Sequence, residues 1–260
     1  MPTEIVRQQT PEEAELIRKR EELAAVRAAL AERELELTDL RAELRSFEGL
    51  YLREIGVLYA ELDEWEARIV ELEASLEKSP ESRNHADEAR KRADQTREAT
   101  HGEASKARDF KPSADLKNLF REVAKRIHPD FAKDDSDRQR RTRLMAQANQ
   151  AYGQGDTEAL QRILNDYHES SETVQGEGIG AELIRIIRQI YEAKKNIASI
   201  EHEITSLRAS EIAQLKHDVE TAQQEGRDLL AELATSLSGK LVRANEKYEA
   251  RATEAKRHER

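Results

Sequence analysis

Apolar residues in the first third of the chain recur at every seventh position. The repeat consists of Leu16, Leu23, Leu30, Leu37, Leu44, Tyr51, Leu58, Trp65 and Leu72. From Tyr51 to Leu76 a second apolar residue lies four residues after each repeat position. These positions together form a continuous apolar stripe along one face of a helix, here called a seam, and no polar residue interrupts it. A narrow seam with this spacing is typical of a coiled coil. The pattern predicts one long N-terminal coiled-coil helix over residues 11–78.

A second seam occupies the last third of the chain. Its apolar residues are spaced alternately three and four residues apart, without exception. They are Leu183, Ile186, Ile190, Ala193, Ile197, Ile200, Ile204 and Leu207. The seam then slips by one position, resumes at Ile212 and includes Gly226, where a bulky partner side chain could approach. Such a slip locally rewinds a coiled coil. We therefore expect a C-terminal coiled-coil helix over residues 181–250.

Between the two seams, residues 113–170 carry a shorter amphipathic pattern. Ser113 is placed to cap a first helix and Pro129 to stop it. The inward positions of that helix are Leu116, Leu119, Phe120, Val123, Ala124 and Ile127. A second helix follows an acidic loop, and Asp156 caps a third. The pattern predicts a small helical unit in which two antiparallel helices hold the polar loop His128-Pro129-Asp130 at one end.

Two stretches read as linkers. From Lys78 to Asp109 there is no Val, Ile, Leu, Met or aromatic residue, and a segment with nothing to bury cannot offset the entropy of being ordered. We expect a charged flexible linker over residues 79–112. Residues 171–180 are rich in glycine, but no lysine follows at the spacing of a nucleotide-binding loop. We expect a flexible Gly-rich linker there.

The two seams and the unit between them predict an all-α protein, in which long coiled-coil helices flank the small helical unit. If the two long helices pair in antiparallel directions, the small helical unit that connects them lies at one end of the pair. A coiled coil between two chains would bury the same seams, so a homodimer is an open alternative. In either arrangement, the seam from Tyr51 to Leu76 should be buried against Leu183–Leu207 or against a second copy of itself.

Composition supports helices with narrow seams, because charged residues make up 37% of the chain and aromatic residues only 4%. The net charge of −10 argues against a general affinity for nucleic acid phosphates. The chain has no cysteine and its histidines are scattered, so we expect no metal site and no cofactor. No apolar run is long enough to span a membrane, and the acidic start differs from a signal peptide. We expect a soluble, cytoplasmic protein.

The middle unit resembles the J-domain of DnaJ-type co-chaperones. The resemblance rests on a basic amphipathic helix that runs into His-Pro-Asp, and on a second helix that ends in the Asn149-Gln150-Ala151-Tyr152 pattern. It covers about a fifth of the chain. The family's opening helix, with its Tyr-x-x-Leu-Gly pattern, is not visible before Pro112. Either another segment packs in its place or the unit is trimmed.

The resemblance implies a docking site for a DnaK-type chaperone. His128 and Asp130 would make the specific contacts, and Pro129 would keep the loop stiff. The basic face of the first helix, formed by Lys117, Arg121, Lys125 and Arg126, would meet an acidic patch on that partner. The chain itself would have no catalytic residues and would accelerate its partner's ATP hydrolysis, while the coiled-coil arms position a client or another assembly protein.

Two other functions are open. The chain would be a coiled-coil scaffold if the middle unit served only as a docking module, and the missing opening helix favours this alternative. An enzyme is the weakest hypothesis, because the sequence has no Walker loop and no Ser/His/Asp set that spacing supports. Stimulation of a DnaK-type ATPase would separate the co-chaperone from the scaffold.

Overall fold

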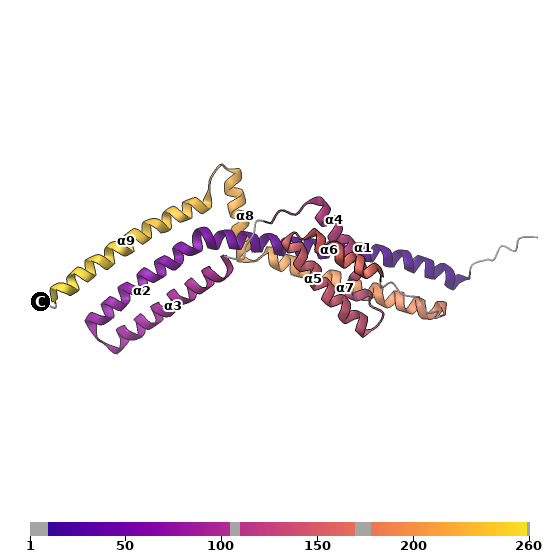
Figure 1. Cartoon of the computed structure of the whole chain (residues 1–260), viewed down its shortest axis with the longest axis horizontal. Helices are drawn as coiled ribbons and strands as arrows, with labels where there is room; N and C mark the ends of the chain where they lie inside the picture. The colour runs from indigo at the N-terminus through magenta and orange to yellow at the C-terminus, as the bar shows by residue number, and fades with distance from the viewer. Residues whose placement is uncertain (1–9, 105–109, 170–177, 259–260) are drawn as a thin grey trace, which may run out of the picture. The chain divides into compact units, whose positions relative to one another are not determined.

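A computed structural model of the chain describes residues 10–104, 110–169 and 178–258 (Figure 1). Every regular element in these ranges is a helix, which confirms the all-α prediction. The helices are α1 Pro11–Tyr51, η1 Leu52–Gly56, α2 Val57–Glu77, α3 Pro80–Ala104, α4 Ala114–Ile127, η2 Pro129–Phe131, α5 Asp135–Gln154, α6 Thr157–Glu169, α7 Ile179–Arg208, α8 Glu211–Gln224 and α9 Leu229–His258.

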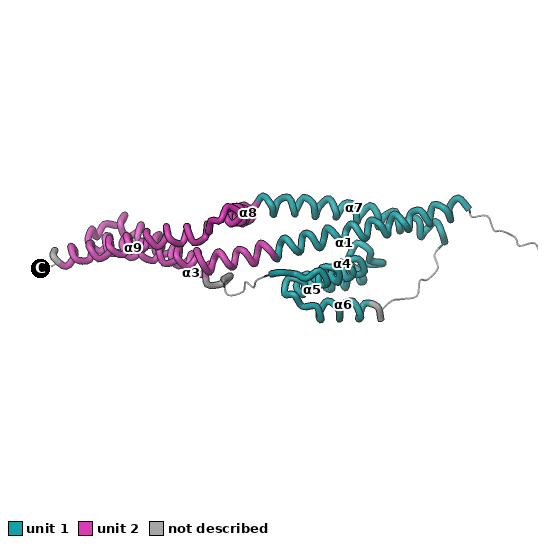
Figure 2. The backbone as a smooth tube through the Cα atoms, turned by 90° about the horizontal axis from the view of Figure 1, so that it is seen from above, with its two compact units in different colours: residues 1–42, 110–209 teal, residues 43–109, 210–260 magenta. Residues whose placement is uncertain are grey.

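The chain forms two compact units (Figure 2). Unit 1 comprises residues 1–42 and 110–209, and unit 2 comprises residues 43–109 and 210–260. In the ranges that the structure describes, no helix is long and apolar enough to cross a membrane.

The N-terminal helix predicted over residues 11–78 is present as α1, η1 and α2. The π-helical turn η1 lies where the spacing of the seam changes, and a π-turn absorbs such a change by adding one residue to a helical turn. Its last residue, Gly56, also permits a close approach. A Cβ atom there would lie 3.1 Å from Cδ2 of Leu52 and 3.4 Å from Cγ2 of Thr100 in α3.

In unit 1 the seam of α1 packs against the seam of α7. Leu16, Leu23 and Leu30 share a buried core with Ile186 and Ile190. The two helices run parallel, because ion pairs join Arg20 to Glu182, Arg33 to Glu201 and Glu36 to Arg208 in ascending order. The antiparallel prediction was wrong. A heptad seam buries the same side chains in either direction, so the intervening chain decides the orientation.

The middle helices α4, α5 and α6 (residues 114–169), with the loop between α4 and α5, form a module that lies beside α1. Ala31 and Leu35 of α1 are buried in the module's own core, among Phe120, Val123 and Tyr152. The prediction that this module lies at one end of a helix pair was therefore wrong. It packs on the side of the α1 helix.

In unit 2 the second half of the N-terminal seam has a different partner from the one predicted. Tyr51, Leu58 and Leu62 pack against residues of α8 and α9, whereas Leu183–Leu207 belongs to the core with α1. Trp65 of α2 contacts Tyr248 of α9, with ring centroids 5.6 Å apart. Of the eight seam positions from Tyr51 to Leu76, Ile55 and Ile69 are buried, five are half-buried, and Leu76 is 42% exposed. The predicted partner Leu183–Leu207 was therefore wrong, because the first half of this seam lies against α8 and α9.

The flexible linker predicted over residues 79–112 was wrong for its larger part, because Pro80–Ala104 forms α3, which packs on α2. Alanine can approach a neighbouring helix closely, and Ala86 and Ala93 are buried there. Arg90 adds ion pairs to Glu64 and Glu71 of α2 at 2.7 Å each. Small side chains and ion pairs thus replace the large apolar residues whose absence suggested a linker. Residues 105–109 lie outside the described residues.

The C-terminal helix predicted over residues 181–250 is divided into α7, α8 and α9. Ser210 caps α8 at the point where the seam slips, so the slip marks a break between helices. Gly226 has a φ of +78° and lies in the turn before α9, and no heavy atom would meet a Cβ there within 4 Å. It is a turn residue and makes no close helix contact. Of the Gly-rich linker predicted over residues 171–180, residues 171–177 lie outside the described residues, and α7 already begins at Ile179.

Candidate functional site

The helix α4 begins and ends where its sequence predicts. The Ser113 hydroxyl accepts a hydrogen bond from the Leu116 backbone N–H at 3.1 Å, which satisfies one of the free donors of the first turn. Five of the six residues of the predicted inward stripe are buried, and the sixth, Leu119, is half-buried. The five are Leu116, Phe120, Val123, Ala124 and Ile127. At His128 the backbone turns to ψ 135°, and Pro129 opens the short helix η2. The end of α4 therefore projects the loop away from the helix axis.

The second long helix of the module, α5, is antiparallel to α4. Its beginning touches the end of α4, because Arg141 donates to the Arg126 carbonyl at 2.8 Å. Its far end returns to the middle of α4, where the Tyr152 and Phe120 rings have centroids 4.8 Å apart. Asp134 caps α5, and Gly155, with a φ of +70°, ends it. Two antiparallel helices thus hold the His128-Pro129-Asp130 loop at one end.

His128 is buried, with 5% of its surface exposed. Its Nδ1 accepts a hydrogen bond from the Asp130 backbone N–H at 3.2 Å, so in the neutral ring the proton is on Nε2. Nε2 lies 3.3 Å from Oε1 of Glu34 in α1 and can donate to it. The resemblance implied that this side chain contacts a partner protein, which stays a prediction. An acidic side chain of the chain's own first helix covers His128.

Asp130 is held from a second direction. Nδ2 of Asn196 in α7 lies 2.6 Å from both carboxylate oxygens of Asp130. The next residue, Phe131, is 4% exposed and belongs to the same buried core as the α1 and α7 seams. The loop is therefore anchored to α1 and α7 by one apolar side chain and by polar contacts at His128 and Asp130.

Arg141 fixes the loop from within the module. It is 6% exposed and donates to the Arg126 carbonyl, to the His128 carbonyl at 3.4 Å, and to the Asp137 carboxylate at 2.7 Å. Burial raises the pKa of Asp137, but hydrogen bonds from Arg141, the Lys133 backbone N–H and Arg140 outweigh burial and hold that pKa below its usual value. Asp137 is therefore ionised and pairs with Arg141.

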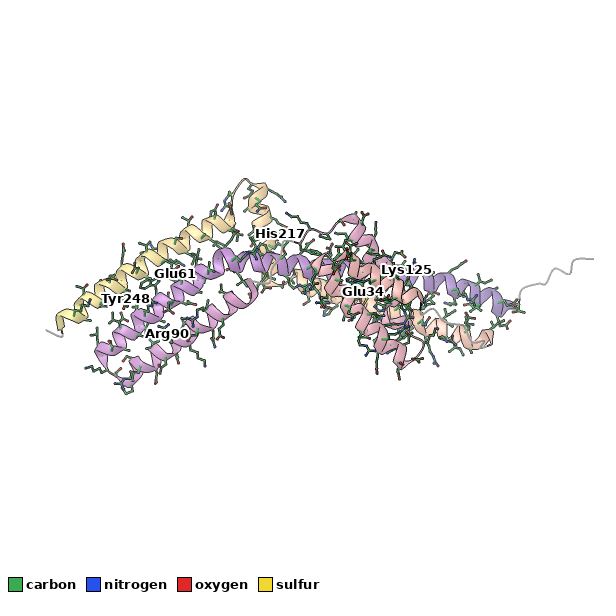
Figure 3. The ribbon with its side chains drawn as sticks, viewed as in Figure 1. Glu34, Glu61, Arg90, Lys125, His217 and Tyr248 are labelled. Carbon is green, nitrogen blue, oxygen red and sulfur yellow. The ribbon has the colours of Figure 1, made fainter. Side chains whose placement is uncertain are left out.

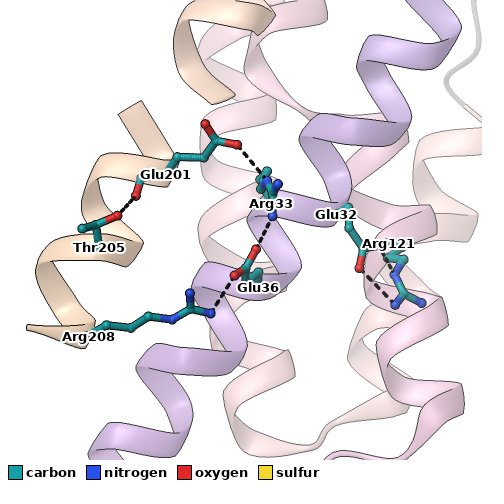
Figure 4. A network of polar contacts seen from close by, with 7 residues as sticks. All are labelled: Glu32, Arg33, Glu36, Arg121, Glu201, Thr205 and Arg208. Carbon is teal, nitrogen blue, oxygen red and sulfur yellow. Dashed lines mark hydrogen bonds and ion pairs between the residues drawn. The ribbon is translucent and has the colours of Figure 1, made fainter. Parts of the chain in front are cut away.

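The basic face of α4 divides into two parts. Lys117 lies 2.6 Å from Asp39. Arg121 lies 2.5 Å from Glu32 (Figure 4), so α1 supplies the acidic partners of both. The Tyr152 hydroxyl also donates to Asp39, at 3.1 Å. Lys125 and Arg126, one turn further along α4, instead line a pocket of about 570 Å³. The predicted basic face thus meets carboxylates of its own chain at one end and a pocket at the other.

All seven predicted site residues belong to one continuous region of unit 1. Figure 3 labels Glu34 on α1 and Lys125 on α4. Sequence reasoning missed Phe131 and Arg141 as site residues. The signals that could have found them are an aromatic residue directly after the tripeptide, and an arginine four residues after Asp137 on one helical face. The acidic residues of α1 and Asn196 of α7 are too far away in sequence for any local signal.

In the described ranges, no group of three or more His, Asp or Glu side chains is placed to hold a metal ion. No protein-family model, curated protein or solved structure matches this chain.

Proposed function

We propose that the module of residues 114–169 is a J-domain-like docking unit, and that the chain is a co-chaperone of a DnaK-type ATPase. The observation that carries the proposal is the stiff loop between α4 and α5. Arg141 ties the His128 carbonyl to both helices, and the His128 ring closes the turn on the Asp130 backbone. A loop ordered before binding loses little entropy on docking, which suits a recognition element.

The packing of α1 supports the same proposal. The module has no opening helix of its own, but Ala31 and Leu35 of α1 enter its core beside Phe120 and Tyr152. We propose that this segment of α1 takes the role of the missing opening helix. The long arms, in turn, would position a client or an assembly protein beside the docking unit.

In this state the docking residues are covered, which adds regulation to the proposal. Glu34 contacts His128, Asn196 contacts Asp130, and Asp39 and Glu32 pair with the basic face. A DnaK-type partner would have to displace these side chains. The pair between Arg121 and Glu32 is more than a third exposed on each side, so by itself it contributes less than about 1 kcal/mol. The pair between Lys117 and Asp39 is less exposed, and Asp39 also accepts from the Tyr152 hydroxyl, so Asp39 contributes more to the cover of the basic face. The buried Phe131 and the core contacts of Ala31 and Leu35 hold the loop and the module against the long helices.

Single-turnover ATP hydrolysis by the host's DnaK-type chaperone tests the proposal. The double variant Glu32→Lys with Asp39→Lys places like charges opposite Arg121 and Lys117 and should uncover the basic face of α4. Its matched control is Glu48→Lys with Glu66→Lys, which reverses two exposed acids outside the site. We expect the uncovered variant to accelerate hydrolysis more than wild type and the control, and His128→Gln in that background to abolish the gain.

The covering contacts also favour a second candidate, a coiled-coil scaffold whose module is a permanent structural element. A loop with His128 and Phe131 buried against α1 and α7 would then serve only to join the module to the arms. The ATPase assay distinguishes the two. If neither wild type nor the uncovered variant accelerates hydrolysis, the co-chaperone proposal fails and the scaffold takes its place.

A further inference from the structure

The pocket beside Lys125 and Arg126 is built from five elements of unit 1. Its volume is about 570 Å³, within the range of roughly 300–1,000 Å³ that is common for sites of small organic ligands. The residues that line it are Arg20, Leu23, Ala24, Arg27, Glu122, Lys125, Arg126, Phe131, Arg141 and Tyr167. Five of these are cationic and one is acidic, although the whole chain has a net charge of −10. The charge of the pocket is therefore opposite to that of the protein.

Three of the five cations have carboxylate partners. Arg20 pairs with Glu182 at 2.6 Å, Arg141 with Asp137 at 2.7 Å, and Arg126 with Glu122 at 3.6 Å. For Arg27 and Lys125, no carboxylate partner is found among the residues that the structure describes. Two positive charges are thus left without compensation in one pocket.

Arg27 carries a buried donor that is not satisfied within the described residues. Its Nε is buried and has no hydrogen-bond acceptor, which is a costly arrangement for a charged donor. Its guanidinium lies over the Phe131 ring, 4.5 Å from the centroid, so the side chain is held in place. Burial lowers the pKa of Arg27, and the charge of Arg141 lowers it further. An anion in the pocket would relieve each of these effects.

We propose that this pocket binds the phosphate group of a small phosphate monoester, with Arg27 and Lys125 as its principal ligands. A phosphate monoester carries about −1.5 to −2 charges at neutral pH, which matches the two uncompensated cations. Arginine also presents a planar fork of donors that suits phosphate oxygens. The volume exceeds what a phosphate alone needs, and Leu23, Phe131 and Tyr167 provide an apolar wall for the organic part of the ligand. A nucleic acid is disfavoured, because the negative charge of the whole chain repels an extended polyanion.

The proposed ligand would join two parts of unit 1. Arg20 and Arg27 come from α1, whereas Lys125 and Arg126 come from α4. A phosphate between them would hold the module against α1 in the covered state. Binding itself does not require the chain to be a co-chaperone, so it is measured without any DnaK-type partner.

The test uses the full chain in a low-salt buffer without phosphate, and measures melting temperature and calorimetric binding. The probes are AMP, inorganic phosphate and adenosine. Adenosine is the nucleoside part of AMP and lacks the phosphate group. We expect AMP to bind and raise the melting temperature, inorganic phosphate to compete with it, and adenosine to have no effect at equal concentration. Added chloride salt should weaken AMP binding, because the attraction is mainly electrostatic.

Two variants locate the site. Arg27→Met keeps a long apolar stem over Phe131 but removes the charge, and Lys125→Met removes the second charge at an exposed position that does not support the fold. Each should weaken AMP binding by about tenfold or more, as expected for the loss of a charge-assisted hydrogen bond. Lys240→Met on α9, an exposed lysine outside the pocket lining, is the matched control and should bind AMP like wild type.

Three results would overturn the proposal. The first is that wild type gives no response to AMP or inorganic phosphate at millimolar concentrations. The second is that adenosine binds as tightly as AMP, which would show that the phosphate is not recognised. The third is equal binding by wild type and Lys125→Met, which remains decisive even if Arg27→Met fails to fold.

Discussion

Nδ2 of Asn196 on α7 lies 2.6 Å from both carboxylate oxygens of Asp130, at the end of the His128-Pro129-Asp130 loop. This contact joins the loop to a helix that begins about fifty residues later in the chain. In this arrangement the Asp130 side chain is 12% exposed. The four predictions that follow test how such contacts hold the loop, the module and α3 in place.

Asn196→Ala should leave the half-buried Asp130 carboxylate without this donor. We expect a loss of about 1–3 kcal/mol in the free energy of unfolding, since a charged acceptor loses its hydrogen bond. Urea unfolding followed by circular dichroism measures it. Asn165→Ala on α6 is the control, because Asn165 is exposed and its side chain accepts from the neighbouring Gln161. Equal stability of the two variants would show that the Asp130 contact contributes nothing.

Phe131→Ala should release the loop from α1 and α7. The side chain is 4% exposed in the core of the two seams, and truncating a buried phenylalanine costs about 3–5 kcal/mol. Hydrogen exchange should show faster exchange in η2 and at the end of α4 than in wild type. Ile17→Ala on α1, at a 43% exposed position, should change stability by less than about 1 kcal/mol. Unchanged protection of the loop in Phe131→Ala would contradict the anchoring role.

Asp137 should make the module less stable in acid. Its pKa is lowered in the folded chain, so its contribution is complete above the unfolded-state pKa of about 3.9 and is lost as the pH falls through the lower folded-state value. Asp137→Asn should cost about 1–3 kcal/mol at neutral pH, because Arg141 loses its charged partner. Urea unfolding of both proteins across the acid range should show this difference shrinking as the pH falls. A difference that stays constant down to the lowest pH would exclude the Asp137–Arg141 pair as its source.

Ala93→Glu should detach α3 from α2. Ala93 is 2% exposed against α2, and a buried charge without a partner costs several kcal/mol. We expect trypsin to cut within α3 much faster in this variant than in wild type. Ala99→Glu makes the same change at an exposed position of the same helix and should leave the cleavage rate as in wild type. Rapid cutting of α3 in all three proteins would restore the interpretation of this segment as a flexible linker.

Local patterns in the sequence determined the helices and several of their ends. The three-and-four spacing of apolar residues predicts α1, α2, α4 and α7, since one face of each helix must be buried. The caps at Ser113 and Asp156, and the stop at Pro129, depend only on residues within one turn, so they could be located without tertiary information. The polar loop between two antiparallel helices was predictable for the same reason.

Tertiary structure alone decided how these helices pair and what covers the site. The seams of α1 and α7 bury the same side chains in parallel or antiparallel order, so their direction depends on the path of the intervening chain. The helix α3 lacks large apolar residues, and its stability comes from close approach to α2 at Ala93 and from the ion pairs of Arg90. Glu34 and Asn196 reach the loop only because α1 and α7 pack on the module. Contacts between residues so distant in sequence leave no periodic or local trace, because they arise only when complementary surfaces meet in the folded chain.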